Sequence, residues 1–313
     1  MFLFSTYFQM VDQEEVAKIQ SVLQMPTTHI VRTAFSLDLR AGEIAALYGN
    51  NWLDDNIINY YLQMILQRSH EKRASNPKIA VINTFWYQKL ASHGYSSVKR
   101  WTRNTNIFDQ DLIFVPVHLG VHWCLAVIDI TNNCVNYYDS LHGKNEYCLR
   151  LLRQFLILEC RDKKQQELEI SKWQFKCIED SPLQQNGYDC GVFLCITAEY
   201  LSRKAPLTFS QEDMPYFRRR MLLQTWVYNN LDCWIRIGKK RRIAKLCVYV
   251  FVFTPFICNV QFSIVSYFGM MSWLIINRNG ADVAESHKYF KLSVWNSLRV
   301  RLRPEIAKIL IKC

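Results

Sequence analysis

Three residues of the sequence have the types needed for nucleophilic chemistry: a cysteine, a histidine and an aspartate. The cysteine, Cys190, lies in the segment QQNGYDCGVF (184–193), between turn-forming residues and an apolar run that predicts a buried helix. A cysteine in the first turn of a helix feels the positive end of the helix dipole, which favours the thiolate. A thiolate acts as a nucleophile when a base lies beside it.

The candidate base is His122, and the candidate partner of its imidazole ring is Asp139. The histidine opens one predicted strand and the aspartate ends the next, 17 residues later. If residues 131–133 form the turn between two antiparallel strands, both side chains lie near one end of the pair. The aspartate can then accept from one imidazole nitrogen while the other nitrogen faces the nucleophile. Taken singly, each residue also fits a structural role, as a strand-end histidine, a turn aspartate or a buried cysteine, and the spacing leaves both interpretations open.

The elements that must position these residues follow from hydrophobic periodicity and turn signals. Residues 54–69 show the clearest helical pattern, with Asp54 or Asp55 as N-cap. Further helices are predicted over 12–24, 146–160, the segment after Cys190 and 210–224. Strands are predicted over 111–117, 122–130, 134–140 and 173–178. Strands in the middle of the chain with helices on either side predict an α+β domain around a small sheet.

The composition is that of a folded protein from a reducing compartment. The chain has 313 residues, half of them hydrophobic, which is enough for a sizeable core. Its 11 cysteines include no CxxC pair, so that neither a disulfide framework nor a zinc site is expected. The apolar N-terminus lacks a basic region and a small-residue cleavage site, which argues against a signal peptide.

The net charge of +11 is concentrated near the C-terminus. Residues 1–224 carry 24 basic and 23 acidic side chains, whereas residues 225–313 carry 14 and 4. The first part therefore gives no reason to expect binding to nucleic acid. Residues 246–277 contain no charge and are mostly apolar, long enough to cross a bilayer, and KKRR precedes them at 239–242. A membrane span, an unstructured tail, and a tail translated from non-coding or alternatively spliced sequence are the alternatives for this region.

The segments VPVHLGVHWCLAVIDI, YYDSLHG and QQNGYDCGVF follow one another in this order. They resemble the catalytic blocks of the sentrin/SUMO-specific cysteine proteases, in the ubiquitin-like-protein protease family. The likeness continues through NNWLDDNIINYYLQMILQRS, INTFWYQKL, GYSSVKRWT and DMPYFRRRM, and covers about residues 10–224. It implies a papain-like α+β fold for a catalytic domain at 1–224. Residues 225–313 form an atypical basic and apolar tail outside the resemblance.

The resemblance also implies a role for each candidate catalytic residue. Cys190 is the nucleophile, His122 is the general base and acid, and Asp139 orients the histidine. Gln184 matches the glutamine whose amide stabilises the oxyanion, although Gln185 gives a second register. We expect neither a metal ion nor an organic cofactor.

Substrate contacts are implied in the same way. Trp52 and Trp123 match two tryptophans that flank a narrow tunnel over a Gly-Gly tail, where only glycines are thin enough to pass. A core position for both tryptophans is the alternative. Weaker correspondences assign contacts with the modifier to Asp55, Phe85, Arg100, Trp101 and His118.

The activity that the resemblance implies is removal of SUMO from target lysines, or processing of the SUMO C-terminus after Gly-Gly, through a thioester. The implied partners are SUMO and SUMO-conjugated proteins. Alternatives are a protease for another ubiquitin-like modifier, an acyltransferase with the same triad, and a catalytically silent SUMO-binding module. The nucleus is the implied location, with the cytoplasm as the alternative, and membrane association would depend on 246–277 alone.

Overall fold

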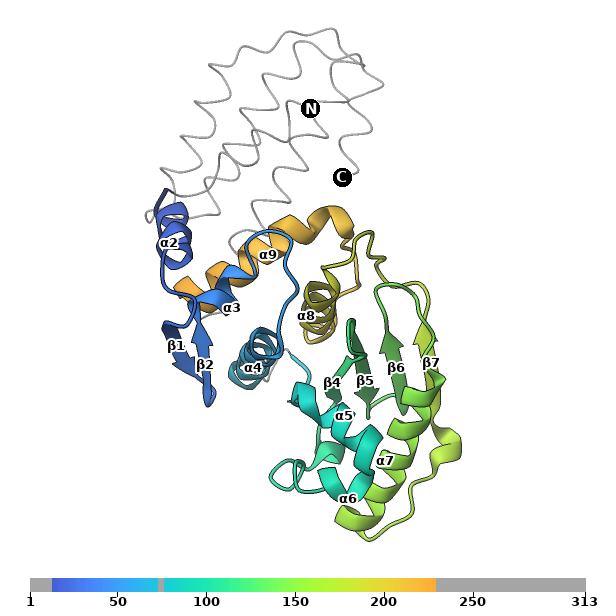
Figure 1. The fold of residues 1–313 in the computed structure, drawn as a ribbon. Coiled ribbons are helices and arrows are strands. Elements are labelled where there is room, and N and C mark those ends of the chain that lie inside the picture. Colours follow the sequence, from blue (N-terminus) through green and yellow to red (C-terminus); the bar gives the residue numbers. More distant parts are fainter. Residues whose placement is uncertain (1–12, 73–75, 229–313) are drawn as a thin grey trace, which may run out of the picture. The chain divides into compact units, whose positions relative to one another are not determined.

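The computed structural model describes residues 13–72 and 76–228 (Figure 1). The KKRR segment, the apolar segment 246–277 and all of the tail after Tyr228 lie outside the described residues. Within the described ranges, no helix is both long enough and apolar enough to cross a membrane.

A mixed sheet of five strands in the order β3-β4-β5-β6-β7 forms the centre of the described region. The three middle strands are antiparallel to one another, while β3 and β7 each run parallel to their neighbour. The strands are Ile79–Val81 (β3), Leu112–His118 (β4), Trp123–Asp129 (β5), Cys134–Tyr138 (β6) and Gln174–Ile178 (β7). The predicted turn at 131–133 joins β5 to β6, so the start of β5 and the end of β6 meet at one edge.

Helices cover both faces of this sheet (Figure 1). Because side chains alternate along a strand, Trp123, Leu125 and Val127 of β5 join the core with one group of helices, while the residues between them join the core with the other. The first group is Asp55–Glu71 (α4), Cys190–Leu201 (α8) and Met214–Leu222 (α9). The second group is Thr84–His93 (α5), Tyr95–Val98 (α6) and Glu146–Lys164 (α7).

The remaining described elements lie near the two chain ends of this region or in loops. A two-stranded antiparallel hairpin of Ile30–Ala34 (β1) and Leu37–Arg40 (β2) is flanked by the helices Gln13–Leu23 (α2) and Ala41–Ala45 (α3). Short 3₁₀ turns are Ile107–Asp109 (η1), Ile170–Lys172 (η2) and Gln211–Asp213 (η3). A π-helical segment, Leu223–Tyr228 (η4), continues α9.

The elements predicted from periodicity are present, and the predicted α+β class is confirmed. Asp54, one of the two candidate caps of α4, accepts a hydrogen bond from the backbone N–H of Ile57 and leaves Asp55 as the first helical residue. The helix predicted over 210–224 is divided into η3, α9 and the start of η4. Pro215 stands in the first turn of α9, where a missing N–H costs nothing, so α9 begins there.

Candidate active site

Cys190 is the first residue of α8, and only 3% of its surface is exposed. The apolar run behind it is buried along its whole length, as its sequence predicts, and anchors the helix between the sheet and α4. The thiol therefore lies at the N-terminal, positive end of a buried helix.

His122 and Asp139 meet at the edge of the sheet where β5 begins and β6 ends. The imidazole Nε2 and the carboxylate Oδ1 are 2.7 Å apart. The same carboxylate oxygen accepts from the backbone N–H of Leu141 at 2.8 Å, which fixes its direction. The residue Gly143 makes room for Asp139, because a Cβ at that position would lie 2.6 Å from Oδ2.

The charges of this pair reinforce one another. The hydrogen bond to Asp139 is the largest of the effects that raise the pKa of His122 to about 12, and contacts with Cys124 and Cys190 add to it. Burial raises the pKa of Asp139, but hydrogen bonds from His122 and Leu141 outweigh burial and leave that pKa below its ordinary value. The Asp139 carboxylate on one side and the Cys190 sulfur on the other thus make the His122 ring a strong proton acceptor.

Cys124, which is not among the residues predicted for the site, also contacts the His122 ring. Its ligand atom and those of His122 and Asp139 all lie within 4.8 Å of one another. Among the described residues these three have types and a spacing that could hold a metal ion. Burial raises the pKa of the Cys124 thiol, so it stays protonated beside the ion pair.

Gln184 and Gln185 lie in different environments. The Gln184 side chain is buried; its Oε1 accepts from the Ser140 hydroxyl at 2.8 Å and its Nε2 donates to the backbone oxygen of Asn186 at 2.5 Å. Gln185 is exposed and uses its backbone N–H to reach the side chain of Gln211. The buried and fixed amide is therefore the one at 184.

The two tryptophans are fixed by their indole N–H groups. Trp52 is 55% exposed and donates to the carbonyl of Gly187 at 2.8 Å, whereas Trp123 is 8% exposed and donates to the carbonyl of Leu53 at 3.1 Å. Trp52 is therefore a surface residue, and Trp123 is buried at the start of β5. Both bonds join segments that border Cys190, and the ring of His118 stacks on Trp123 at 4.2 Å between centroids.

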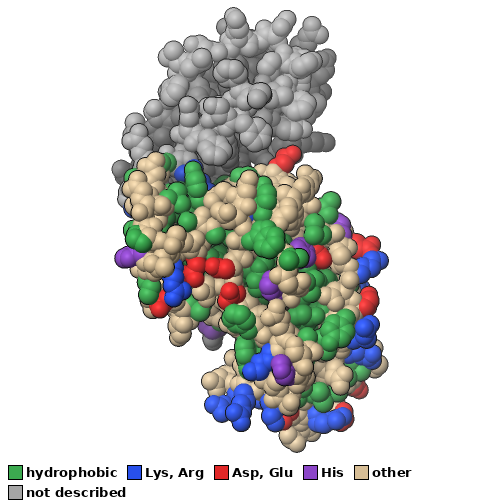
Figure 2. Space-filling model, viewed as in Figure 1, with side chains coloured by type: hydrophobic (Ala, Val, Ile, Leu, Met, Phe, Trp, Pro, Cys, Tyr) green, Lys and Arg blue, Asp and Glu red, His purple; other side chains and the backbone are tan. Residues whose placement is uncertain are grey.

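The other predicted contact residues are accessible on the surface that continues from these tryptophans. Phe85 and Trp101 are 54% and 42% exposed, Arg100 is exposed, and Asp55 and His118 are half-buried. The α5 side chains Gln88 and Lys89 connect them: Gln88 bonds the ring of His118, and the Lys89 ammonium lies over Trp101. Figure 2 shows basic side chains gathered at the lower end of the view, in the region of α6 and α7.

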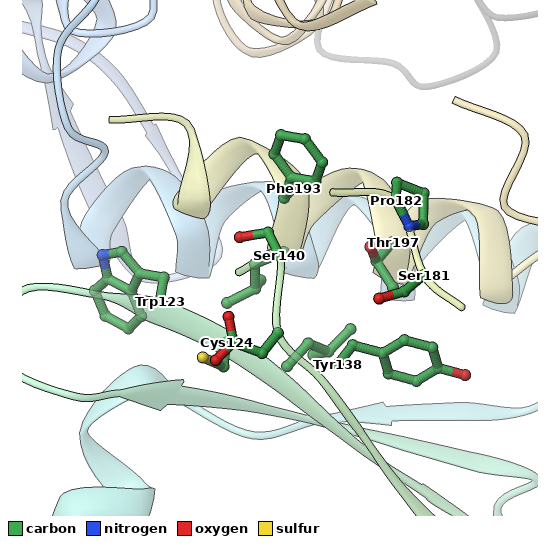
Figure 3. A pocket seen from close by; sticks show the side chains of 11 residues that line it. Trp123, Cys124, Tyr138, Ser140, Ser181, Pro182, Phe193 and Thr197 are labelled. Atoms are coloured by element: carbon green, nitrogen blue, oxygen red, sulfur yellow. The ribbon is translucent and has the colours of Figure 1, made fainter. Parts of the chain in front are cut away.

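A small cavity lies next to Asp139, between β5, β6 and α8 (Figure 3). Its lining includes Trp123, Asp139, Ser140 and Thr197. Its volume of about 10 Å³ is close to the minimum for a single water molecule. It is therefore too small to admit a substrate.

Comparison with known proteins identifies this arrangement. Residues 51–229 match the Ulp1 protease family, C-terminal catalytic domain, over more than half of the chain. The chain belongs to this family. The resemblance of the three sequence blocks is thereby confirmed.

Relatives in the family include a sentrin-specific protease of Caenorhabditis elegans, 47% identical over 61% of this chain and 27% of that protein. Human sentrin-specific protease 2 is 40% identical over 63% of this chain and 33% of its own length. The chain thus spans about a third or less of the length of these two relatives. Among solved structures, the C-terminal Ulp1 protease domain in complex with Smt3, the yeast ortholog of SUMO, is 28% identical, with a TM-score of 0.60 over 69% of this chain and 95% of the other.

Proposed function

We propose that this chain is a cysteine protease that removes SUMO from lysine side chains of target proteins or trims the SUMO C-terminus after Gly-Gly. The observation that carries the proposal is the His122 ring, which bonds Asp139 through Nε2 and contacts the thiol of Cys190 at the start of α8. A thiol, an imidazole and an orienting carboxylate in this order are the parts of a cysteine nucleophile.

The reaction begins with proton transfer from Cys190 to His122. The thiolate attacks the carbonyl carbon of the terminal glycine, and the carbonyl oxygen becomes an oxyanion. The imidazolium then gives its proton to the leaving amine, the C–N bond breaks, and a thioester remains on Cys190. A water molecule that loses a proton to His122 attacks the thioester carbonyl, releases the SUMO carboxylate and restores the thiol.

Gln184 and the backbone N–H of Cys190 are the proposed donors to the oxyanion. The amide Nε2 of Gln184 carries two hydrogens and donates to Asn186 twice, to the backbone oxygen at 2.5 Å and to Oδ1 at 3.4 Å, so the oxyanion would take the place of the longer bond. Its carbonyl is held by Ser140, so that the amide plane is fixed before the substrate arrives. A donor fixed in advance stabilises the developing charge without reorganisation.

The Gly-Gly tail of the modifier is proposed to pass between Trp52 and Trp123 on its way to Cys190. Both indole rings are held by a hydrogen bond from Nε1 to a backbone carbonyl, so the gap between them keeps its width. A side chain on either glycine would collide with a ring, which makes the tryptophans a filter for diglycine. The surface of Phe85, Arg100, Trp101, Asp55 and His118 would bind the folded body or the tail of the modifier.

The test uses SUMO and other ubiquitin-like modifiers that each carry an electrophile at the C-terminus. SUMO is expected to form a covalent adduct with the full chain, and mass spectrometry is expected to place it on Cys190. Cys190→Ser is expected to bind SUMO without forming the adduct. Labelling by another modifier alone would change the proposed substrate, and adduct formation on a different cysteine would overturn the assignment of the nucleophile.

The nucleus is the proposed site of action, supported by the family resemblance. A fluorescent fusion of the full chain is expected to accumulate there. A fusion restricted to the cytoplasm or to membranes would contradict this part of the proposal.

A further inference from the structure

Arg218, on α9, connects two loops that border the candidate active site. Its side chain is buried, with 4% of the residue exposed, and it donates four hydrogen bonds. Two reach the loop before Cys190, at the Asp189 carboxylate (2.6 Å) and the carbonyl of Tyr188 (2.9 Å). The other two reach the segment before Trp52, at the carbonyls of Ala46 (3.0 Å) and Asn51 (2.7 Å).

We propose that Arg218 is a positioning residue for catalysis, and that its four bonds, here called the Arg218 clamp, keep Cys190 and Trp52 in a fixed relation. The inference rests on the proposed function, because it assigns Cys190 and Trp52 the roles of nucleophile and tunnel wall. Arg218 itself lies beneath the loops, and its effect on the reaction passes through them.

The first link of the clamp controls the nucleophile. Asp189 directly precedes Cys190, so the peptide between them carries the backbone N–H proposed to stabilise the oxyanion. The Asp189 carboxylate is buried and accepts from Arg218, Asn186 and Gln211 at 2.6–2.7 Å. Although Asp189 stands at the N-cap position of α8, its side chain makes no cap bond and turns to these donors instead.

The second link controls the tunnel. Asn51 directly precedes Trp52, and the Trp52 indole donates back to Gly187 in the loop of the nucleophile. The two segments also touch at Gly191, where a Cβ would lie only 2.9 Å from the Cβ of Leu53. The segments are therefore joined by the guanidinium below and by the indole bond at the surface, with close packing at the start of α8.

Only an arginine can make this connection. A guanidinium presents five N–H groups in a planar fork, which allows one side chain to reach acceptors on two loops at once. A lysine ammonium at the same place would keep the charge beside Asp189 but lacks the rigid fork. Arg218→Lys therefore separates the effect of geometry from that of charge.

The chain offers a matched control at the C-terminal end of α8, where a second buried arginine, Arg68 of α4, binds. Arg68 is also buried and pairs with the buried Glu199 at 2.5 Å and with the hydroxyl of Ser202 at 2.6 Å. Glu199 is nine residues after Cys190, which is about 13 Å along an α-helix. Arg68→Met breaks a buried ion pair of the same kind without touching either loop of the active site.

The experiment compares Arg218→Met, Arg218→Lys and Arg68→Met in the full chain. The assays are hydrolysis of SUMO with a C-terminal fluorogenic amide, thermal unfolding, and the rate at which iodoacetamide alkylates Cys190. Both Arg218 variants are expected to lose at least tenfold in kcat, with less than a threefold change in KM, and to alkylate more slowly. Arg68→Met is expected to lower the unfolding temperature by a similar amount and to keep kcat within threefold of the parent.

Each outcome has a distinct meaning. A kcat of Arg218→Lys within threefold of the parent would overturn the inference, as would equal losses of kcat in the Arg68 and Arg218 variants. If Arg218→Met does not fold, the kcat values of Arg218→Lys and Arg68→Met are compared instead, and they test the inference in the same way. Failure of the parent chain to cleave the SUMO amide would count against the proposed function, and alkylation of Cys190 would still report on the clamp.

Discussion

The hydrogen bond between His122 and Asp139 links the protonation of the site to the stability of the fold. The folded pKa of Asp139 lies below its ordinary 3.8, so its contribution is present above that value and is lost as the pH falls through the lowered pKa. The folded pKa of His122 is raised from 6.5 to about 12, so its contribution is complete below 6.5 and declines as the pH rises towards 12. The pair therefore stabilises the fold most between about pH 4 and 6.5.

Asp139→Asn removes this contribution, and its effect on stability is expected to depend on pH. The difference in unfolding free energy between the parent and the variant is expected to be larger at pH 5 than at pH 9, measured by urea denaturation. The variant is also expected to lose about 10⁴-fold in kcat, because the imidazole is no longer held in the correct tautomer. A difference in stability that is independent of pH would contradict the coupling.

Gln184→Ala and Gln185→Ala form a matched pair that tests the oxyanion assignment. The buried amide at 184 is expected to matter, with a loss of about 10²–10³ in kcat and little change in KM. The exposed side chain at 185 is expected to be replaceable within about twofold. Steady-state hydrolysis of the SUMO amide distinguishes them, and the reverse pattern would shift the register by one residue.

For single residues, the sequence predicts which side chains could react better than it predicts what surrounds each of them. A hairpin and the start of a helix are predicted to bring together His122, Asp139 and Cys190, and these three side chains lie together in the structure. The sequence does not predict the contact between Cys124 and the His122 ring, because a cysteine in a hydrophobic strand is expected to be a core residue. Its position two residues after the histidine was the available signal, since such residues share a face of a strand.

Among the elements, α7 fixes the loop that carries two predicted substrate contacts. Its residue Glu159 is buried and accepts from the hydroxyls of Thr102 (2.5 Å) and Tyr95 (2.7 Å). These donors lie on either side of Arg100 in the sequence, and Thr102 directly follows Trp101. The carboxylate therefore holds the surface proposed to bind the modifier, far along the chain from the nucleophile.

Glu159→Met is expected to loosen this loop and weaken binding of the modifier. The KM for the SUMO amide is expected to rise about tenfold, equivalent to about 1.4 kcal/mol, with kcat nearly unchanged. Arg150→Ala, at an exposed position on the same helix, is the control and is expected to leave both constants unchanged. A fall in kcat with constant KM would place the effect of Glu159 in the catalytic site instead.

The element boundaries show where periodicity is informative. The face of apolar residues in α4 predicts that helix to within two residues, because a buried stripe repeats every three to four positions. The loops at 46–51 and 184–189 have no such repeat, so their conformations could not be predicted. They are fixed instead by distant partners such as Arg218, whose role depends on the tertiary fold.

At the scale of the whole molecule, the C-terminal boundary of the proposed catalytic domain at 1–224 falls inside η4, a segment that packs against the rest of the described chain. Thr225 is buried and donates to the carbonyl of Met221 at 2.8 Å. Trp226 donates from its indole to the carbonyl of Lys18 and accepts from Arg32 at its own carbonyl. These bonds connect the end of the described chain to its beginning, while every proposed active-site residue lies before 225.

A chain ending at residue 224 is therefore expected to keep its catalytic residues but to unfold more easily than one ending at 228. The expected difference is roughly 1–3 kcal/mol, the usual range for losing a helix end with its contacts. Urea denaturation of the two proteins measures it, and labelling by the SUMO electrophile checks the site. Equal stability would show that the bonds of Trp226 add little, and a folded but unreactive 1–228 protein would mean that later residues complete the site.

The Arg218 clamp also has a consequence for the order in which the protein acquires activity during synthesis. Arg218 follows Cys190 by 28 residues, which takes roughly 1–6 s at typical rates of translation. With the clamp acting as proposed, a nascent chain exposes its thiol before the guanidinium that aligns it exists. The growing polypeptide would then be unable to cleave its substrate until α9 had left the ribosome. A transcript cut short within those 28 codons would yield a chain that contains Cys190 but has no protease activity.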